Sequence, residues 1–181
     1  MTESAPKLRL AGPQWKFAIA LYGQTGVSEA CLFLQDRWRV DVSLLIAMLY
    51  AAGVLHHRID AAAVQVADDA INVWRERVIA PLRTVRRDMK TMPTNEHPAA
   101  AELRETVKSA ELKAEQVELM LLAELIEEMP AAERAPQSLP AVAAHVVGHF
   151  ADAPVADAET IQAIGLIAEA AAAVAAMDLP S

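Results

Sequence analysis

Apolar residues recur every three to four positions through most of the chain, which is the period of an amphipathic α-helix. Prolines, glycines and helix-capping residues divide this pattern into segments. It predicts helices over residues 13–22, 27–38, 42–55, 60–90, 99–129, 140–150 and 156–177. The candidate core side chains are Trp15, Leu21, Cys31, Leu34, Leu45, Leu49, Trp74 and Leu82. The fold class is therefore all-α, a bundle of six or seven helices, with the almost wholly apolar helix 42–55 at its centre.

The two longest predicted helices are joined by a short connector between Pro93 and Pro98. Long helices with so short a link form an antiparallel hairpin, here over about residues 60–129. Pro81 lies inside the first of them and should kink or split it near Ala80. In a hairpin that folds near residue 95, Arg86 opposes Glu105. The second helix carries a seam of three-four spacing, formed by Leu103, Val107, Ala110, Ala114, Val117 and Leu121.

Residues 130–140 contain three prolines and few apolar residues, which is typical of a linker. We therefore expect three parts: a helical core over 1–129, the linker 130–140, and a C-terminal pair of helices over 141–181. The last helix carries an apolar face formed by Ile161, Ile164, Ile167, Ala168, Ala171 and Val174. This face packs either on the core of the same chain or on a second copy in a twofold dimer.

Composition and charge narrow the function classes. The chain has 181 residues, a net charge of −8 and one cysteine, so it has no intrachain disulfide and no cysteine-based zinc finger. An acidic chain is a poor binder of nucleic acid. It shows no signal peptide, no phosphate-binding glycine loop and no complete catalytic set. We expect a cytoplasmic protein with no membrane span and no cofactor, and the sequence leans against an enzyme without excluding one.

One polar group stands out where the helix 27–38 ends and the next helix begins. Gln35, Asp36 and Asp41 meet there, opposite a basic strip formed by Arg75, Arg77, Arg83, Arg86, Arg87 and Lys90. Carboxylates, an amide and guanidiniums around one junction could hold a small anionic ligand or a metal ion. The candidate ligand-binding residues are Gln35, Asp36, Asp41, Arg83, Arg86 and Arg87. The alternative is structural, because Asp41 can cap a helix and Asp36 can pair with an arginine.

A second candidate lies near the C-terminus. His145 and His149 are four residues apart on one helix, and Asp152 follows three positions later. Two imidazoles at this spacing and a carboxylate can ligate a metal ion. The alternative is packing, because the neighbouring residues are valine, alanine, glycine and phenylalanine. Cys31 lies between apolar neighbours with no histidine nearby in the sequence, which favours a buried structural thiol over a nucleophile.

Three motifs in fixed order carry a resemblance. They are Cys31-Leu32-x-Leu34-Gln35-Asp36, then Asp41-Val42, then Pro81-Leu82-Arg83-x-x-Arg86-Arg87. Over about residues 13–128 the chain resembles a family of small proteobacterial proteins catalogued as a domain of unknown function. The resemblance implies a helical fold and brings no activity. The chain departs from that family at Arg39, where the family tends to have glycine, and at Ser43, where it tends to have asparagine.

The sequence supports two functions of different classes. The first is a noncatalytic binding or adaptor protein that acts through helix–helix surfaces, with a protein partner or a second copy of the chain. The second is a binder of a small molecule or anion, and possibly an enzyme, that uses the Gln35, Asp36 and Asp41 junction with Arg83 and Arg86.

Overall fold

The computed structural model describes residues 10–129, 137–152 and 157–177, and all regular secondary structure in these ranges is helical. The elements are α1 (Pro13–Tyr22), α2 (Val27–Trp38), α3 (Val42–Gly53), α4 (Ala61–Trp74), the π-helical turn η1 (Arg75–Ile79), α5 (Ala80–Thr91), the 3₁₀ turn η2 (Pro93–Glu96), α6 (Pro98–Glu128), α7 (Leu139–Ala151) and α8 (Ala158–Ala175). Because α4, η1 and α5 form one continuous rod, the described part of the chain holds seven helices. The all-α prediction is confirmed.

Helix α3 is the centre of the bundle, as its apolar sequence predicts. Asp41 caps it, with the carboxylate accepting a hydrogen bond from the Leu44 N–H at 3.1 Å. Ten of its 12 residues are buried. Helices α1, α4, α6, α7 and α8 all pack against it. The same core contains Leu21, Cys31, Leu34, Leu45 and Leu49, as predicted, whereas Trp15, Trp74 and Leu82 are only half-buried.

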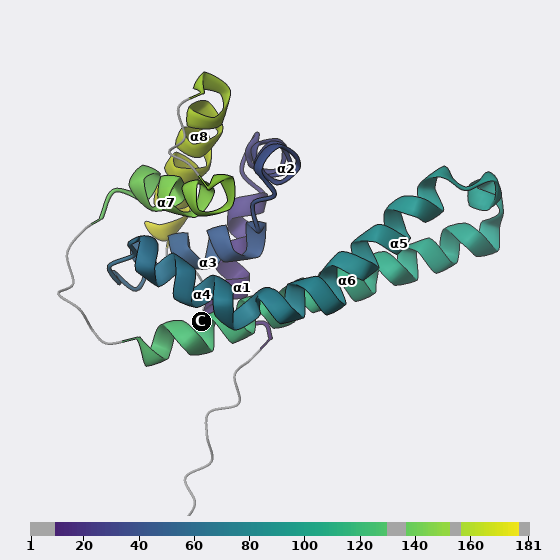
Figure 1. Ribbon diagram of the computed structural model, residues 1–181, viewed down its shortest axis with the longest axis horizontal. Coiled ribbons are helices and arrows are strands. Elements are labelled where there is room, and N and C mark those ends of the chain that lie inside the picture. The colour runs from purple at the N-terminus through teal and green to yellow at the C-terminus, as the bar shows by residue number, and fades with distance from the viewer. Residues whose placement is uncertain (1–9, 130–136, 153–156, 178–181) are drawn as a thin grey trace, which may run out of the picture.

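The predicted hairpin is present, and its outer part extends away from the bundle (Figure 1). We call residues 80–110, which include α5, η2 and the first part of α6, the arm. Helix α5 has no buried residue, and the buried residues of α6 begin only at Glu111. Of the predicted seam of α6 only Ala114 is buried. Leu103, in its outer part, is exposed, because in the arm each helix has only one neighbour.

Pro81 does not end the helical rod, and the α-helical winding is interrupted just before it, over η1 and up to Ala80. Proline lacks an N–H, and in an α-helix its ring clashes with the carbonyl four residues earlier. The turn before it, η1, is wound as a π-helix, and the Ala80 N–H reaches back five residues to the Arg75 carbonyl. This wider turn accommodates Pro81 while the helix continues.

Helices α7 and α8 pack on the rest of the same chain. Helix α7 lies against α3 and α4, and α8 lies against α1, α2 and α3. The predicted face of α8 is buried apart from Ile161, which is exposed. The neighbouring Thr160 is buried in its first turn instead. Packing within the chain thus uses this face, and a twofold dimer through α8 stays a prediction. Most of the predicted linker, residues 130–136, lies outside the described residues.

Helix α8 is also long and apolar enough to cross a membrane by length and composition alone, and α1 with α2, bent by 97°, passes the same test as a pair. Core helices of soluble proteins pass it too. In this structure Ile164, Ile167 and Ala171 of α8 are buried against neighbouring helices.

Candidate functional site

A cavity of about 210 Å³ opens where α2 gives way to α3, and η1, α5 and α6 form its other walls. Its lining residues are Gln35, Asp36, Arg39, Val40, Asp41, Arg75, Ile79, Ala80, Arg83, Thr84, Arg87 and Glu118. Five of the six candidate ligand-binding residues therefore line one cavity, although they come from helices far apart in the sequence. Arg86 does not line it. Their role in binding a ligand stays a prediction.

The backbone between α2 and α3 shapes one wall of this cavity. Arg39 ends α2 in the left-handed conformation, with φ at 61° and its N–H bonded to the Gln35 carbonyl. A side chain with a Cβ is strained in this region, and glycine is not. The glycine expected here from the family resemblance thus has a structural reason. The sharp reversal places Gln35, Arg39 and Asp41 on the same wall.

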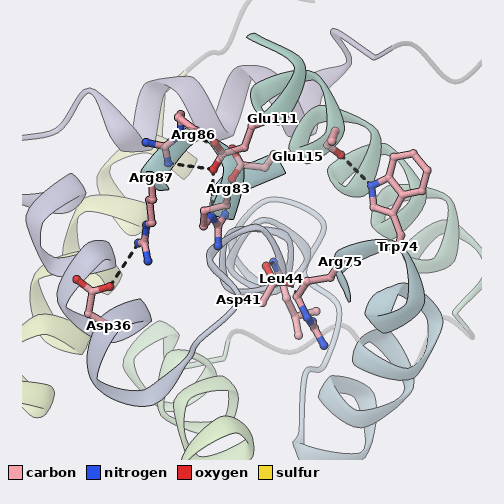
Figure 2. Close-up of polar contacts among 11 residues, drawn as sticks. Asp36, Asp41, Leu44, Trp74, Arg75, Arg83, Arg86, Arg87, Glu111 and Glu115 are labelled. Carbon is pink, nitrogen blue, oxygen red and sulfur yellow. Dashed lines mark hydrogen bonds and ion pairs between the residues drawn. The ribbon is translucent and has the colours of Figure 1, made fainter. Parts of the chain in front are cut away.

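A chain of charged groups runs from the cavity to α7. Arg75 donates to Asp41 at 2.9 Å, and the same guanidinium lies 2.7 Å from Asp68 (Figure 2 shows the first pair). The other Asp68 oxygen lies 2.9 Å from the His149 ring nitrogen Nε2. Arg75 also stacks over the Phe150 ring at 5.5 Å. Helix α7 thereby helps to hold Arg75, one of the residues that line the cavity.

Two arginines of the basic strip, Arg83 and Arg86, are neutralised by glutamates of α6 (Figure 2). Arg83 donates to Glu111 at 3.0 Å and to Glu115 at 2.6 Å, and Arg86 pairs with Glu111. Burial raises the pKa of Glu111, but the hydrogen bonds from Arg86 and Arg83 outweigh it and hold that pKa below its ordinary value. Burial raises the pKa of Glu115 despite Arg83.

The partner of Arg86 differs from the sequence prediction, which placed it opposite Glu105. Side chains tilt toward the N-terminus of their own helix. In an antiparallel pair, Arg86 leans toward the bundle and Glu111 leans away from it, so the two meet although their backbones are offset. Glu105 pairs instead with Arg104 and Lys108 on its own helix.

Two arginines of the cavity are not neutralised in this way. Arg87 approaches Asp36 at 3.6 Å, and both side chains are at least half exposed, so the pair is weak. The guanidinium of Arg39 has no hydrogen bond or ion pair with any other described residue. The cavity thus combines neutralised arginines with two that can accept an anion.

Glu118 is the cavity residue that sequence reasoning missed. Its side chain is 1% exposed, and its Oε1 atom has no hydrogen-bond partner among the described residues. The carboxyl group contacts Asp41 and Ser43. Burial, and next the negative charge of Asp41, raise the pKa of Glu118 to about 9. The carboxyl is therefore protonated at neutral pH.

The predicted metal set does not come together. Within the described ranges, no group of three histidine, cysteine, aspartate or glutamate side chains is arranged to hold a metal ion. His149 bonds to Asp68, His145 is exposed, and Asp152 ends α7 in the left-handed conformation. Cys31 is buried as predicted, and burial raises the pKa of its thiol to about 12.

Fold and cavity together define an all-helical bundle protein with a projecting hairpin and an arginine-lined pocket. The family model described as "Protein of unknown function (DUF2390)" matches residues 13–122, more than half of the chain, and the chain belongs to that family. This confirms the resemblance found in the sequence. No curated protein and no solved structure matches the chain. Every cavity-lining residue lies within the matched part, whereas His149 lies beyond it.

Proposed function

We propose that this protein binds a small anion in the cavity between α2, α3 and α5. The single observation that carries the proposal is Arg39. Arg39 lines the cavity, and its guanidinium has no partner among the described residues, although its backbone conformation costs about 1 kcal/mol or more for a residue other than glycine. Such local strain is typical of positions retained for function.

The chemistry of the lining favours an oxyanion. Guanidinium groups donate pairs of hydrogen bonds to phosphate and carboxylate oxygens. Arg39 and Arg87 have N–H donors that are not used in strong hydrogen bonds within the protein. The two charges of a phosphate dianion equal the charges of these two guanidinium groups. The chain as a whole has a net charge of −8, which repels anions from most of its surface, so binding at this pocket depends on the arginines that line it.

The size of the cavity limits the ligand. A volume of about 210 Å³ has room for roughly seven water molecules at the ~30 Å³ that each occupies in the liquid. This suits a phosphate monoester with a short carbon chain. The proposal assigns binding and no reaction.

Calorimetric titration of the full chain with inorganic phosphate and a short phosphate monoester tests this function. We expect saturable binding that weakens about tenfold in Arg39→Gly and in Arg87→Gln, the loss that corresponds to one charged hydrogen-bonded contact. Arg37→Gln is the matched control, because Arg37 lies in the same turn of α2 but stacks on Trp38 outside the cavity. Absence of saturable binding, or equal weakening by Arg37→Gln, would contradict the proposal.

A second function, an adaptor acting through helix–helix contacts, is supported by the arm. Val85, Met92 and Leu103 in the arm are each about half exposed. A projecting hairpin with apolar side chains on its surface can pair with helices of another protein. The test is co-purification of a partner in stoichiometric amount with the full chain. Val85→Glu and Leu103→Glu should release that partner while phosphate binding persists.

A further inference from the structure

Besides the anion cavity, the described part of the chain has an open groove between α2 and α8, with a volume of about 440 Å³. Ala30 and Ala163 line it and are buried, and their short side chains leave room between the two helices. Phe33 and Leu166, which are half-buried, form its apolar walls. The groove shares no lining residue with the anion cavity, so it is a separate site.

The rim of the groove carries negative charge without a positive partner. Glu29 and Glu159 line the groove and are exposed, and neither carboxylate has an ion pair with any described residue. Helix α8 contains no lysine or arginine, and the only one in α2 is Arg37, which stacks over Trp38. Apolar walls with an unbalanced negative rim favour an occupant that is both apolar and positively charged.

The length of the groove fits a helix. From Glu159 to Leu166, α8 rises by about 10 Å at 1.5 Å per residue, which corresponds to two helical turns. A helix that lies along the groove places side chains at positions i, i+4 and i+7 on the face toward it. Leu32, next to Phe33 on α2, is 53% exposed and extends the apolar surface. An anionic lipid surface fits less well, because its charge would repel both glutamates.

We propose that this groove binds an amphipathic helix of another protein. Aliphatic side chains at i, i+4 and i+7 of that helix fill the groove, and lysine or arginine residues beside them pair with Glu29 and Glu159. Because exposed ion pairs are weak, apolar burial supplies most of the affinity, and the two carboxylates select basic helices over acidic ones. The inference goes beyond anion binding and adds a protein-binding surface that is separate from the arm.

The test is a fluorescence anisotropy titration of the full chain with synthetic peptides of about 18 residues, a length that allows a helix to form. Two peptides share a stripe of leucines at helical spacing, which is flanked by lysine in one and by glutamate in the other. We expect the lysine peptide to bind about tenfold more tightly, since two ion pairs replace two contacts between like charges. The lysine peptide with serine in place of leucine should not bind, because it cannot fill the apolar groove.

Charge reversal then locates the site. In the double variant Glu29→Lys, Glu159→Lys the preference should invert, so that the glutamate peptide binds more tightly. The matched control is Glu127→Lys, Glu128→Lys, which changes the net charge equally at exposed positions of α6 outside the groove. This control should still prefer the lysine peptide. Equal affinities of the unaltered chain for the two peptides, or an inversion in the control, would overturn the proposal.

Sedimentation of the full chain tests the rival occupant, which is a second copy of the chain. If the unaltered chain forms a dimer that the lysine peptide dissociates, the second copy occupies the groove and the proposal is wrong. A chain that remains monomeric while it binds the lysine peptide supports the proposal. Phosphate binding is tested independently, because the groove and the cavity have no lining residue in common.

Discussion

The indole N–H of Trp38 donates a hydrogen bond to the Thr160 hydroxyl at 2.8 Å, across 122 positions of sequence. Trp38 is the last residue of α2, and Thr160 lies in the first turn of α8 with no exposed surface. The bond thus joins the helix that leads into the cavity to the C-terminal helix.

Replacing Thr160 with valine should destabilise the fold. The two side chains have nearly the same shape, so the change removes the hydroxyl and leaves the indole N–H without its acceptor. We expect the free energy of unfolding to fall by about 1–2 kcal/mol, measured by urea denaturation. Thr160→Ser keeps the acceptor and should lose less. An unchanged stability of Thr160→Val would mean that water replaces the threonine.

Arg39→Gly should separate stability from binding. Glycine adopts φ at 61° without strain, so we expect the free energy of unfolding to rise by up to about 1 kcal/mol. The same variant should bind phosphate less tightly, as described above. Arg39→Ala loses the charge but keeps the strain, and it should gain no stability. If Arg39→Gly gains stability and keeps its affinity for phosphate, Arg39 plays no part in binding.

The raised pKa of Glu118 makes stability depend on pH. In the unfolded chain this carboxyl ionises near its ordinary pKa of 4.5, whereas in the fold its pKa is about 9. Between these values the folded state binds more protons, so the contribution of Glu118 to stability falls as the pH rises, by at most about 1.4 kcal/mol per pH unit. Glu118→Gln does not ionise and lacks this dependence. We expect its advantage over the unaltered chain to grow from pH 5 to pH 8 in urea denaturation, and a constant difference would contradict this.

Glu111 should show the opposite trend. Its pKa is lowered in the fold by Arg86 and Arg83, so its contribution to stability is present above its ordinary pKa of 4.5 and is lost as the pH falls through the folded value. Glu111→Gln should lower the free energy of unfolding at pH 7 by about 1–3 kcal/mol, since two partly exposed arginines lose a charged partner. The deficit of the variant should shrink as the pH falls from 4.5 through the lowered pKa of Glu111 in the fold. A deficit that is independent of pH would indicate lost packing instead.

Much of the fold follows from local signals in the sequence. Asp41 and Asp60 cap helices, Pro13 and Pro98 begin helices, and Gly26 adopts the left-handed conformation in the turn before α2. Each of these depends on the chemistry of a few adjacent residues. What could not be predicted is how deeply each apolar side chain is buried. Leu103 has the same spacing as the buried residues of α6, but it lies in the part of the hairpin that projects from the bundle.

The candidate site also contains residues that the sequence could bring together and residues that it could not. Asp41 and the arginines of α5 could be brought together because a helix cap and a hairpin place them. The sequence indicated Arg75 only as part of a basic strip. Its partners could not be predicted, since Asp41 precedes α3 and Asp68 lies two turns earlier in α4. Glu118 is one of many glutamates in α6. Its position four residues from both Ala114 and Leu122, which are buried, was the signal that could have placed it on the inner face.

The π-helical turn η1 has a consequence for how this chain tolerates insertions and deletions. A π-helical turn holds one residue more than an α-helical turn, so removing one residue, such as the exposed Glu76, would restore α-helical winding. Because a π-helical turn takes up its extra residue within the turn, the helix beyond it would keep nearly the same orientation about its axis, and Arg83, Arg86 and Arg87 would keep their places. Pro81 would then follow an α-helical turn, in which its ring clashes with the carbonyl four residues earlier. The extra residue between Trp74 and Pro81 therefore serves the proline and not the direction of the arginines.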